Sequence, residues 1–176
     1  MGKRMCFLLL PIVLVAVSGA PITEGATMAA MTITSPAFRN GELIPSKFTC
    51  DGADVNPALN IGNVPQEAKS LALIMDDPDA PGGMWVHWVA WNIDPKTREI
   101  KENGVPPGAQ LGVNDFRKTP YGGPCPPSGT HRYFFKLYAL DTMLDLGPDA
   151  TKTALEKSMK GHIVAQGEMM GRYKRK

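Results

Sequence analysis

The sequence is poor in cysteine and histidine, carries little net charge, and lacks an apolar run long enough to span a membrane. Its 176 residues include three cysteines and three histidines, and the formal net charge is +2. A balance this close to neutral gives no sign of nucleic-acid binding. The most apolar run, residues 7–17, is shorter than the roughly 20 residues that a spanning helix needs. No permanent membrane anchor is therefore expected.

Several common catalytic fingerprints are also absent. The chain has no G-x-S-x-G nucleophile elbow, no phosphate-binding P-loop and no glycine fingerprint for dinucleotides. Serine-hydrolase, nucleotide-hydrolase and NAD-dependent activities therefore have no support in the sequence. We expect a protein that is not an enzyme and has no cofactor.

The first 29 residues have the pattern of a secretory signal peptide. Lys3 and Arg4 precede the apolar run, and small residues follow it. Cleavage is expected between about residue 20 and residue 30, leaving residues 30–176 as a single domain that is periplasmic or secreted. An alternative remains open, in which translation starts at Met28 or Met31 and the protein is cytoplasmic.

The few cysteines allow only one bridge in the mature chain. Cys6 is lost with the signal peptide, so Cys50 and Cys125 remain. Disulfides persist in oxidising compartments, and a bridge here would close a loop of about 75 residues. The sequence favours a disulfide, with two separate buried thiols as the alternative.

Hydrophobic patterning indicates a mainly β protein. The Gly- and Pro-rich stretch 103–129 has no periodicity, but Val113, Phe116 and Tyr121 argue for a packed loop. A helix is expected after Asp149 as N-cap, ending near Gly161. We predict an antiparallel β-sandwich with one helix near the C-terminus and short peripheral helices. Strands are expected at residues 31–38, 42–50, 59–61, 71–75, 88–91, 97–101, 132–140 and 166–173.

An acidic turn lies between the two strands at 71–75 and 88–91. Asp77 and Asp79 alternate with Pro78, and Pro81 follows. Proline restricts its own φ and favours extended geometry in the residue before it, so both carboxylates could point to the same side. His87 begins the second strand, which places a polar site on a loop held by a rigid scaffold.

A second polar stretch runs from Gly122 to Tyr133. Its glycines would let backbone N–H groups approach a ligand, and its prolines would stiffen the loop. His131 and Tyr133 share one strand face, because side chains repeat every two residues in a strand. If the two stretches converge, imidazole and backbone N–H groups would grip an anion, while carboxylates orient the rings or receive an ammonium group.

Three other interpretations of these residues stay open. The histidines could pair with aspartate for structural reasons alone. Asp77, Asp79, His87 and His131 could hold the metal of a hydrolase, although no HExxH or paired-cysteine spacing supports this. Cys125 could be a nucleophile with His131 as its base, although a disulfide would remove that thiol.

Both stretches resemble the signature regions of the phosphatidylethanolamine-binding protein family, and most closely its bacterial Raf-kinase-inhibitor-like branch. Residues 48–52, 112–116 and 160–162 are also similar to that branch, and the resemblance runs from about Met31 to the end. It implies a β-sandwich with a small pocket for phosphate-like groups. Carried over by motif, the lining is Asp77, Asp79, Pro81, Trp85, His87, Gly123, Pro124, His131 and Tyr133.

The implied partner is therefore a small anionic or phosphorylated ligand, with a partner protein as a further target. Eukaryotic members have a longer insert where Gly82, Gly83 and Met84 stand, and no counterpart of their C-terminal helix follows Tyr173. The resemblance therefore does not extend to lipid specificity or kinase inhibition. Exposed sheet edges would permit a homodimer, but nothing in the sequence requires one.

Overall fold

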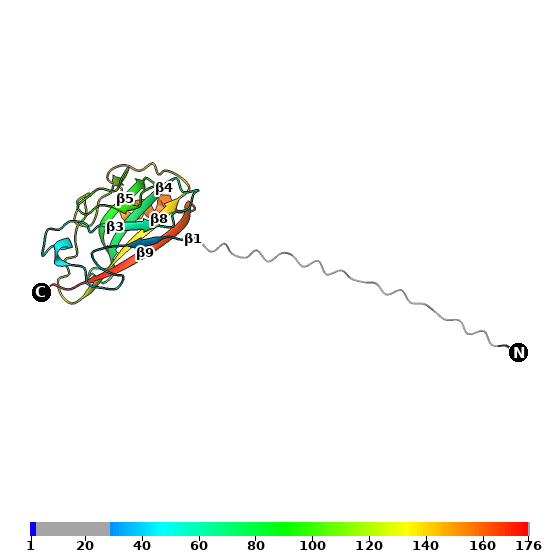
Figure 1. Ribbon diagram of the computed structural model, residues 1–176, viewed down its shortest axis with the longest axis horizontal. Helices are drawn as coiled ribbons and strands as arrows, with labels where there is room; N and C mark the ends of the chain where they lie inside the picture. The colour runs from blue at the N-terminus through cyan, green and yellow to red at the C-terminus, as the bar shows by residue number, and fades with distance from the viewer. Residues whose placement is uncertain (3–28, 176) are drawn as a thin grey trace.

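The computed structural model describes residues 1–2 and 29–175 and shows two sheets packed face to face (Figure 1). The predicted signal sequence, including Cys6, lies outside these residues except at its two ends. The pairings within the large sheet are antiparallel except that of β1 with β9. The six-stranded sheet has the order β1 (Ala29–Ala30), β9 (Ile163–Tyr173), β8 (His131–Leu140), β4 (Ser70–Asp77), β5 (Trp85–Ile93), β7 (Gln110–Leu111). The three-stranded sheet has the order β2 (Thr32–Thr34), β3 (Leu59–Gly62), β6 (Glu99–Ile100). The predicted β-sandwich is confirmed.

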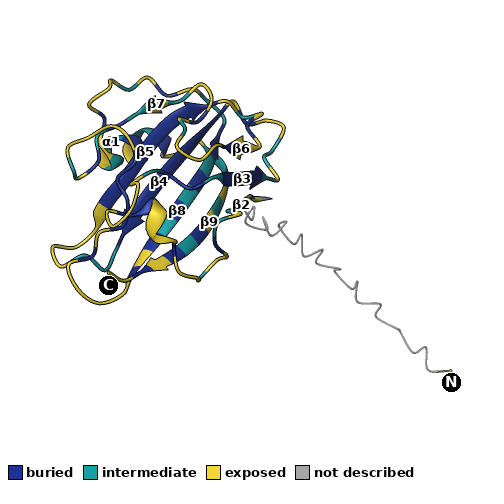
Figure 2. Ribbon diagram, turned by 60° about the vertical axis from the view of Figure 1, so that its left-hand side comes forward, coloured by how far each residue is buried: buried dark blue, intermediate teal, exposed yellow. Residues whose placement is uncertain are grey.

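Apolar side chains cover both faces of the large sheet. One cluster fills the space between the two sheets and includes Leu73, Trp88 and Phe135. The other lies between the large sheet and helix α1 (Lys152–Met159), and includes Trp91 and Leu155. β4 is buried along its whole length, as Figure 2 shows. Burial on both faces explains why this strand is a continuous apolar run rather than an alternating one.

Two local predictions were wrong. The strand expected at residues 42–50 is absent from the described structure: Leu43 forms an isolated bridge, and residues 46–48 form a short 3₁₀-helix, η1 (Ser46–Phe48). Pro45 precedes it with φ −58°, and Thr49 ends it by donating its Oγ1 hydroxyl to the Ser46 carbonyl. Helix α1 is capped by Thr151, whose side chain accepts from the Ala154 N–H, because Asp149 belongs to the preceding turn.

The stretch 103–129 is a packed loop, as its apolar anchors predicted. Asn114 organises it: the side-chain amide donates to the carbonyls of His87 and Pro120 and accepts from the N–H groups of Phe116 and Lys118. Tyr121 is buried and donates its hydroxyl to the Phe48 carbonyl. The same loop contains β7, a two-residue edge strand that the sequence patterns did not indicate.

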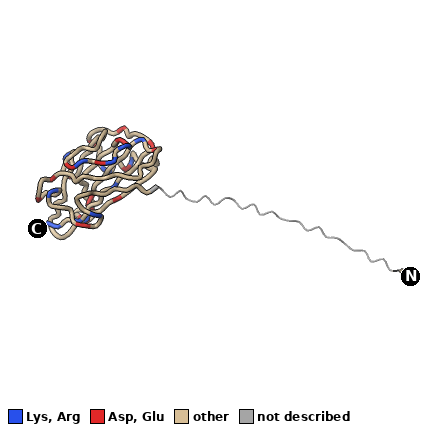
Figure 3. The backbone as a smooth tube through the Cα atoms, viewed as in Figure 1, with Lys and Arg blue, Asp and Glu red and all other residues tan. Residues whose placement is uncertain are grey.

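A disulfide and a buried ion cluster tie distant parts of the chain together. Cys50 and Cys125 are bonded, as the sequence favoured. Asp76 on β4 is fully buried and pairs with Lys136 of β8 and Lys152 of α1. Elsewhere, residues of both signs are interspersed along the chain (Figure 3). Within residues 29–175, no helix has the length and apolar character needed to cross a membrane.

Candidate functional site

The two predicted stretches converge on one cavity of about 290 Å³ at the end of the large sheet where β4 ends and β5 and β8 begin. His87 and His131, which are 44 positions apart in the sequence, both line it. Trp85 stands at its edge and is 38% exposed. The full lining is Asp77, Ala80, Pro81, Gly82, Trp85, His87, Phe116, Cys125, Pro126, Pro127 and His131.

A β-bulge aims His87 at this cavity. Met75 on β4 pairs with Trp88, whereas the next residue, Asp76, pairs with Val86. β5 therefore has one extra residue, His87, which has no partner on β4. Such a bulge interrupts strict alternation and redirects a side chain. Val86 consequently packs on the helix side of the sheet, while Trp88 packs between the sheets.

The ring of His87 is held by one hydrogen bond. Its Nδ1 lies 2.6 Å from the Gly122 carbonyl oxygen, and its Nε2 is buried with no partner among the described residues. Phe116 and Tyr133 pack edge-on against it, with ring centroids 5.2 Å away in both cases. A Cβ added at position 122 would lie 2.5 Å from a ring carbon of Phe116, so a larger residue there would displace the Phe116 ring. Burial lowers the pKa of His87, opposed by the Gly122 bond and by Asp77.

His131 is oriented by a carboxylate. Its Nδ1 donates to Asp77 Oδ2 at 2.7 Å, and Asp77 Oδ1 accepts from the Asp79 N–H at 2.8 Å. Tyr133, two residues further along β8, is fully buried, and its hydroxyl has no hydrogen-bond partner within the part of the chain that the structure describes. Burial, together with the nearby Asp77 carboxylate, raises the pKa of Tyr133. His131 is therefore a fixed imidazole on the cavity wall, and the Tyr133 phenol is buried near the same carboxylate.

Four of the predicted lining residues do not line the cavity. Asp79 binds Arg132 through two side-chain bonds, of 2.8 and 2.6 Å, and accepts the Arg132 backbone N–H at 2.9 Å. It therefore does not share a side with Asp77, because it stands in the turn after β4 and is drawn to the arginine. Gly123 donates its N–H to Asp54, and Pro124 offers its carbonyl to the Cys50 N–H. The fourth, Tyr133, packs edge-on against the His87 ring.

The Asp79–Arg132 pair gives a prediction about acid stability. The Arg132 hydrogen bonds lower the pKa of Asp79 from 3.8 to about 2. This stabilisation is present above the unfolded pKa and is lost as pH falls through the folded one. Asp79→Asn should lower the free energy of unfolding at neutral pH by about 1 kcal/mol, since the pair is screened by solvent. In urea titrations the difference from wild type should shrink towards pH 2; Asp145→Asn, at an exposed site, is the control.

Six lining residues were missed from the sequence. Ala80 and Gly82 belong to the acidic turn, and Cys125, Pro126 and Pro127 to the second stretch. Their positions within these two loops could have identified them as lining residues. Phe116 was foreseen only as an anchor of the packed loop. Its contact with His87 depends on the Asn114 hydrogen bonds, which no sequence pattern indicated.

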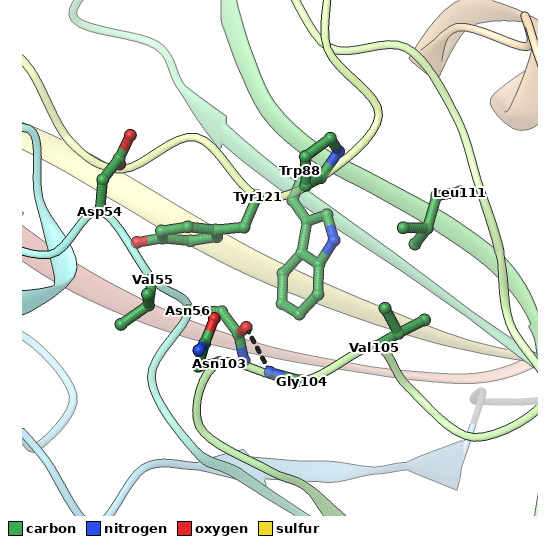
Figure 4. Close-up of a pocket in the computed structure, with 10 residues that line it drawn as sticks. Asp54, Val55, Asn56, Trp88, Asn103, Gly104, Val105, Leu111 and Tyr121 are labelled. Carbon is green, nitrogen blue, oxygen red and sulfur yellow. Dashed lines mark hydrogen bonds between the residues drawn. The ribbon is translucent and has the colours of Figure 1, made fainter.

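A second, smaller cavity lies beside the site. It has a volume of about 130 Å³ and is lined by Trp88 and Tyr121, the chain neighbours of His87 and Gly122. Figure 4 shows it between these rings and the Asn56 and Asn103 side chains. Asn56 already accepts from the Gly104 N–H and donates to the Pro57 and Lys101 carbonyls. It is a weaker candidate, because its volume is less than half that of the first cavity and its Asn56 amide is already satisfied.

The two catalytic interpretations gain nothing from this geometry. Cys125 is bonded to Cys50, so it is not a free nucleophile. Among the residues that the structure describes, no group of three or more His, Cys, Asp or Glu side chains is placed to hold a metal ion. Asp79, which the metal interpretation needs, is occupied by Arg132.

Comparison with known proteins identifies the relatives of the chain. Residues 34–174 match the family described as phosphatidylethanolamine-binding protein. A protein of Methanothermobacter thermautotrophicus, described as a UPF0098 protein, is 49% identical over 150 residues, covering 82% of this chain and 99% of its own length. A UPF0098 protein of Pyrococcus abyssi is 50% identical over 156 residues, covering 83% of this chain and 86% of its own length.

Solved structures show the same fold. One is a putative phosphatidylethanolamine-binding protein homologue from Chlamydia trachomatis, with a TM-score of 0.80 and 42% identity over 84% of this chain and 99% of that one. Another is YbcL of E. coli, described as a new member of the mammalian family, with a TM-score of 0.78 and 30% identity over 84% of this chain and all of that one.

Proposed function

Because the chain belongs to the phosphatidylethanolamine-binding protein family, we propose that it is a non-enzymatic binding protein whose cavity holds a small anion or phosphate-type group. One observation carries the proposal. His87 lines the cavity, and its ring nitrogen Nε2 is buried and has no partner in the described chain. Buried polar atoms are nearly always hydrogen-bonded. An unpaired ring nitrogen on a residue that lines a cavity therefore supports binding of a polar ligand.

The surroundings of the cavity favour an anion over a cation. Its single carboxylate, Asp77, is already engaged by His131 and by the Asp79 N–H. The polar atoms left for a ligand therefore come from imidazole groups, which can share a proton with a bound oxyanion. Trp85, Phe116 and prolines surround them, so the ligand's remainder would meet apolar surface.

The proposal is tested by phosphate binding to His87→Ala. Inorganic phosphate should bind the wild-type protein and raise its melting temperature, by an amount that grows with the logarithm of the ratio of ligand concentration to Kd. His87→Ala should weaken binding by roughly 10- to 100-fold, the worth of one hydrogen bond to a charged group. Isothermal titration measures the affinity, and circular dichroism checks that the variant is folded.

The matched control is the same change at His162. This residue is about half exposed and bonds Asp141 on the molecular surface. His162→Ala should bind phosphate as the wild type does. An unchanged affinity in His87→Ala would remove the cavity from the assignment.

We further propose that the protein works outside the cytoplasm and can act on a partner protein. The leader-like pattern at residues 1–29 supports export, and the Cys50–Cys125 bond suits an oxidising compartment. Met84 and Trp85, both exposed beside the cavity, are the surface that a partner would meet next to bound ligand. Sequencing the amino terminus of the purified protein tests export, because cleavage would remove the leader. Comparing the wild type with Met84→Ala in a pull-down tests whether this surface contacts a partner protein.

A further inference from the structure

We propose that the cavity binds its oxyanion together with one proton, held between a ligand oxygen and His87 Nε2. The site then prefers phosphomonoesters to phosphodiesters and sulfate esters. This inference rests on the proposed function and names the ligand class of the same site. It follows from the direction of one hydrogen bond, described next.

The Gly122 carbonyl fixes the tautomer of His87. A carbonyl oxygen can only accept, so Nδ1, 2.6 Å away, must carry the hydrogen. In the neutral ring Nε2 then has a lone pair and no hydrogen. Nε2 is also the buried atom without a partner among the described residues. A fully ionised oxyanion, which offers lone pairs only, would therefore meet another lone pair there.

The groups around His87 do not supply the missing hydrogen. From β4, Asp77 faces the ring, and from the packed loop Asp115 acts on it at longer range. From β8, His131 gives its Nδ1 hydrogen to Asp77, and the buried Tyr133 hydroxyl stands beside the same carboxylate. Both carboxylates favour a charged His87, whereas burial disfavours it more strongly. With its pKa lowered below 6.5, the empty ring is neutral at pH 7 and above, and the proton must arrive with the ligand or from solution.

The source of the proton separates ligand classes. A phosphomonoester has a second pKa of about 6, so near neutrality part of it carries a P–OH that can donate to Nε2. A phosphodiester, such as a phospholipid headgroup, and a sulfate ester have one acidic group that is fully ionised. They can bind only after His87 takes a proton from water, against the cost of burial.

The test measures protons as well as affinity. Methyl phosphate, dimethyl phosphate and methyl sulfate are titrated calorimetrically into the wild-type protein, in buffers of different ionisation enthalpy. At about pH 8 the binding of each methyl phosphate should be accompanied by the uptake of about one proton from solution. Near pH 5 the uptake should be close to zero, because methyl phosphate is then already protonated. Its affinity should fall about tenfold per pH unit above its second pKa. Dimethyl phosphate and methyl sulfate should bind at least about tenfold more weakly near pH 6.

Two variants locate the proton. In His87→Gln an amide N–H can donate to the ligand without titrating. Proton uptake at about pH 8 should therefore disappear, and the ratio of monoester to diester affinity should become smaller. His162→Gln, at the exposed histidine, should behave as wild type. If His87→Gln does not fold, nitrogen NMR of the wild-type ring replaces it: Nε2 should be unprotonated in the free protein and protonated or hydrogen-bonded in the complex.

The outcomes distinguish the inference from the function on which it rests. Failure of all three ligands to bind would overturn the anion-binding function. Equal affinity for monoester and diester, or binding at high pH without proton uptake, would overturn the inference alone. Proton uptake that persists in His87→Gln would also overturn it, because the proton would then belong to another group such as His131.

Discussion

Replacing Cys50 and Cys125 together by serine is expected to lower the free energy of unfolding by about 4.5 kcal/mol on the chain-entropy account. The bond links residues 75 positions apart, so its loss restores much freedom to the unfolded chain. Few small domains keep a large margin after such a loss, since total stability is typically about 5–15 kcal/mol. Urea unfolding of the wild type and the double variant under oxidising conditions measures the difference.

Reduction provides the control for this result. Dithiothreitol should bring the wild-type protein close to the double variant and should leave the double variant unchanged. A loss of less than about 1 kcal/mol would contradict the expectation and would place residual structure in the reduced unfolded chain. Cys125 also lines the cavity that contains His87, so under the proposed function phosphate affinity should fall in the same samples.

The second large effect is expected at the buried ion cluster. Lys136→Met combined with Lys152→Met would leave the Asp76 carboxylate fully buried without its two cations. An uncompensated buried charge costs about 3–5 kcal/mol, so the double variant should be strongly destabilised. Methionine keeps most of the aliphatic length of lysine, which limits the contribution of lost packing. Chemical denaturation at neutral pH gives the value.

Removing the charge itself provides the matched variant. With Asp76→Leu added to the two methionine substitutions, no ion remains to be compensated, and most of the lost stability should return. If the triple variant is as unstable as the double one, the cluster acts through shape or through the placement of α1, not through charge. The i,i+4 pair of Lys152 with Glu156 is exposed on the Glu156 side and should contribute little.

The parts of the fold predicted from the sequence are those with a strong local pattern. β4, β5 and β8 are long apolar or aromatic stretches, and each was placed to within a few residues. The segment before Cys50 was expected to continue a strand, but Pro45 and the Thr49 hydroxyl favour a 3₁₀ turn there. Local patterns therefore identify the core strands well. They fail for a short segment such as residues 46–48, where a side chain hydrogen-bonds to the backbone.

The candidate site divides in the same way. The convergence of His87 and His131 was foreseen, since both begin core strands beside proline-rich turns. The ion pair that draws Asp79 away from the cavity was not foreseen, because Asp79 and Arg132 are 53 positions apart in the sequence. The bulge that turns His87 towards the cavity depends on the register between β4 and β5. Neither long-range ion pairs nor register shifts leave a trace in a single sequence.

The neighbouring carboxylates at the end of β4 divide two tasks between the faces of the sheet. Asp76 faces α1 and is held by lysines, whereas Asp77 faces the cavity and holds His131. Two adjacent residues thus contribute to different properties: Asp76 to the stability of the contact with α1, and Asp77 to the arrangement of the cavity. A substitution at Asp76 should therefore act mainly on stability, and one at Asp77 mainly on the orientation of His131.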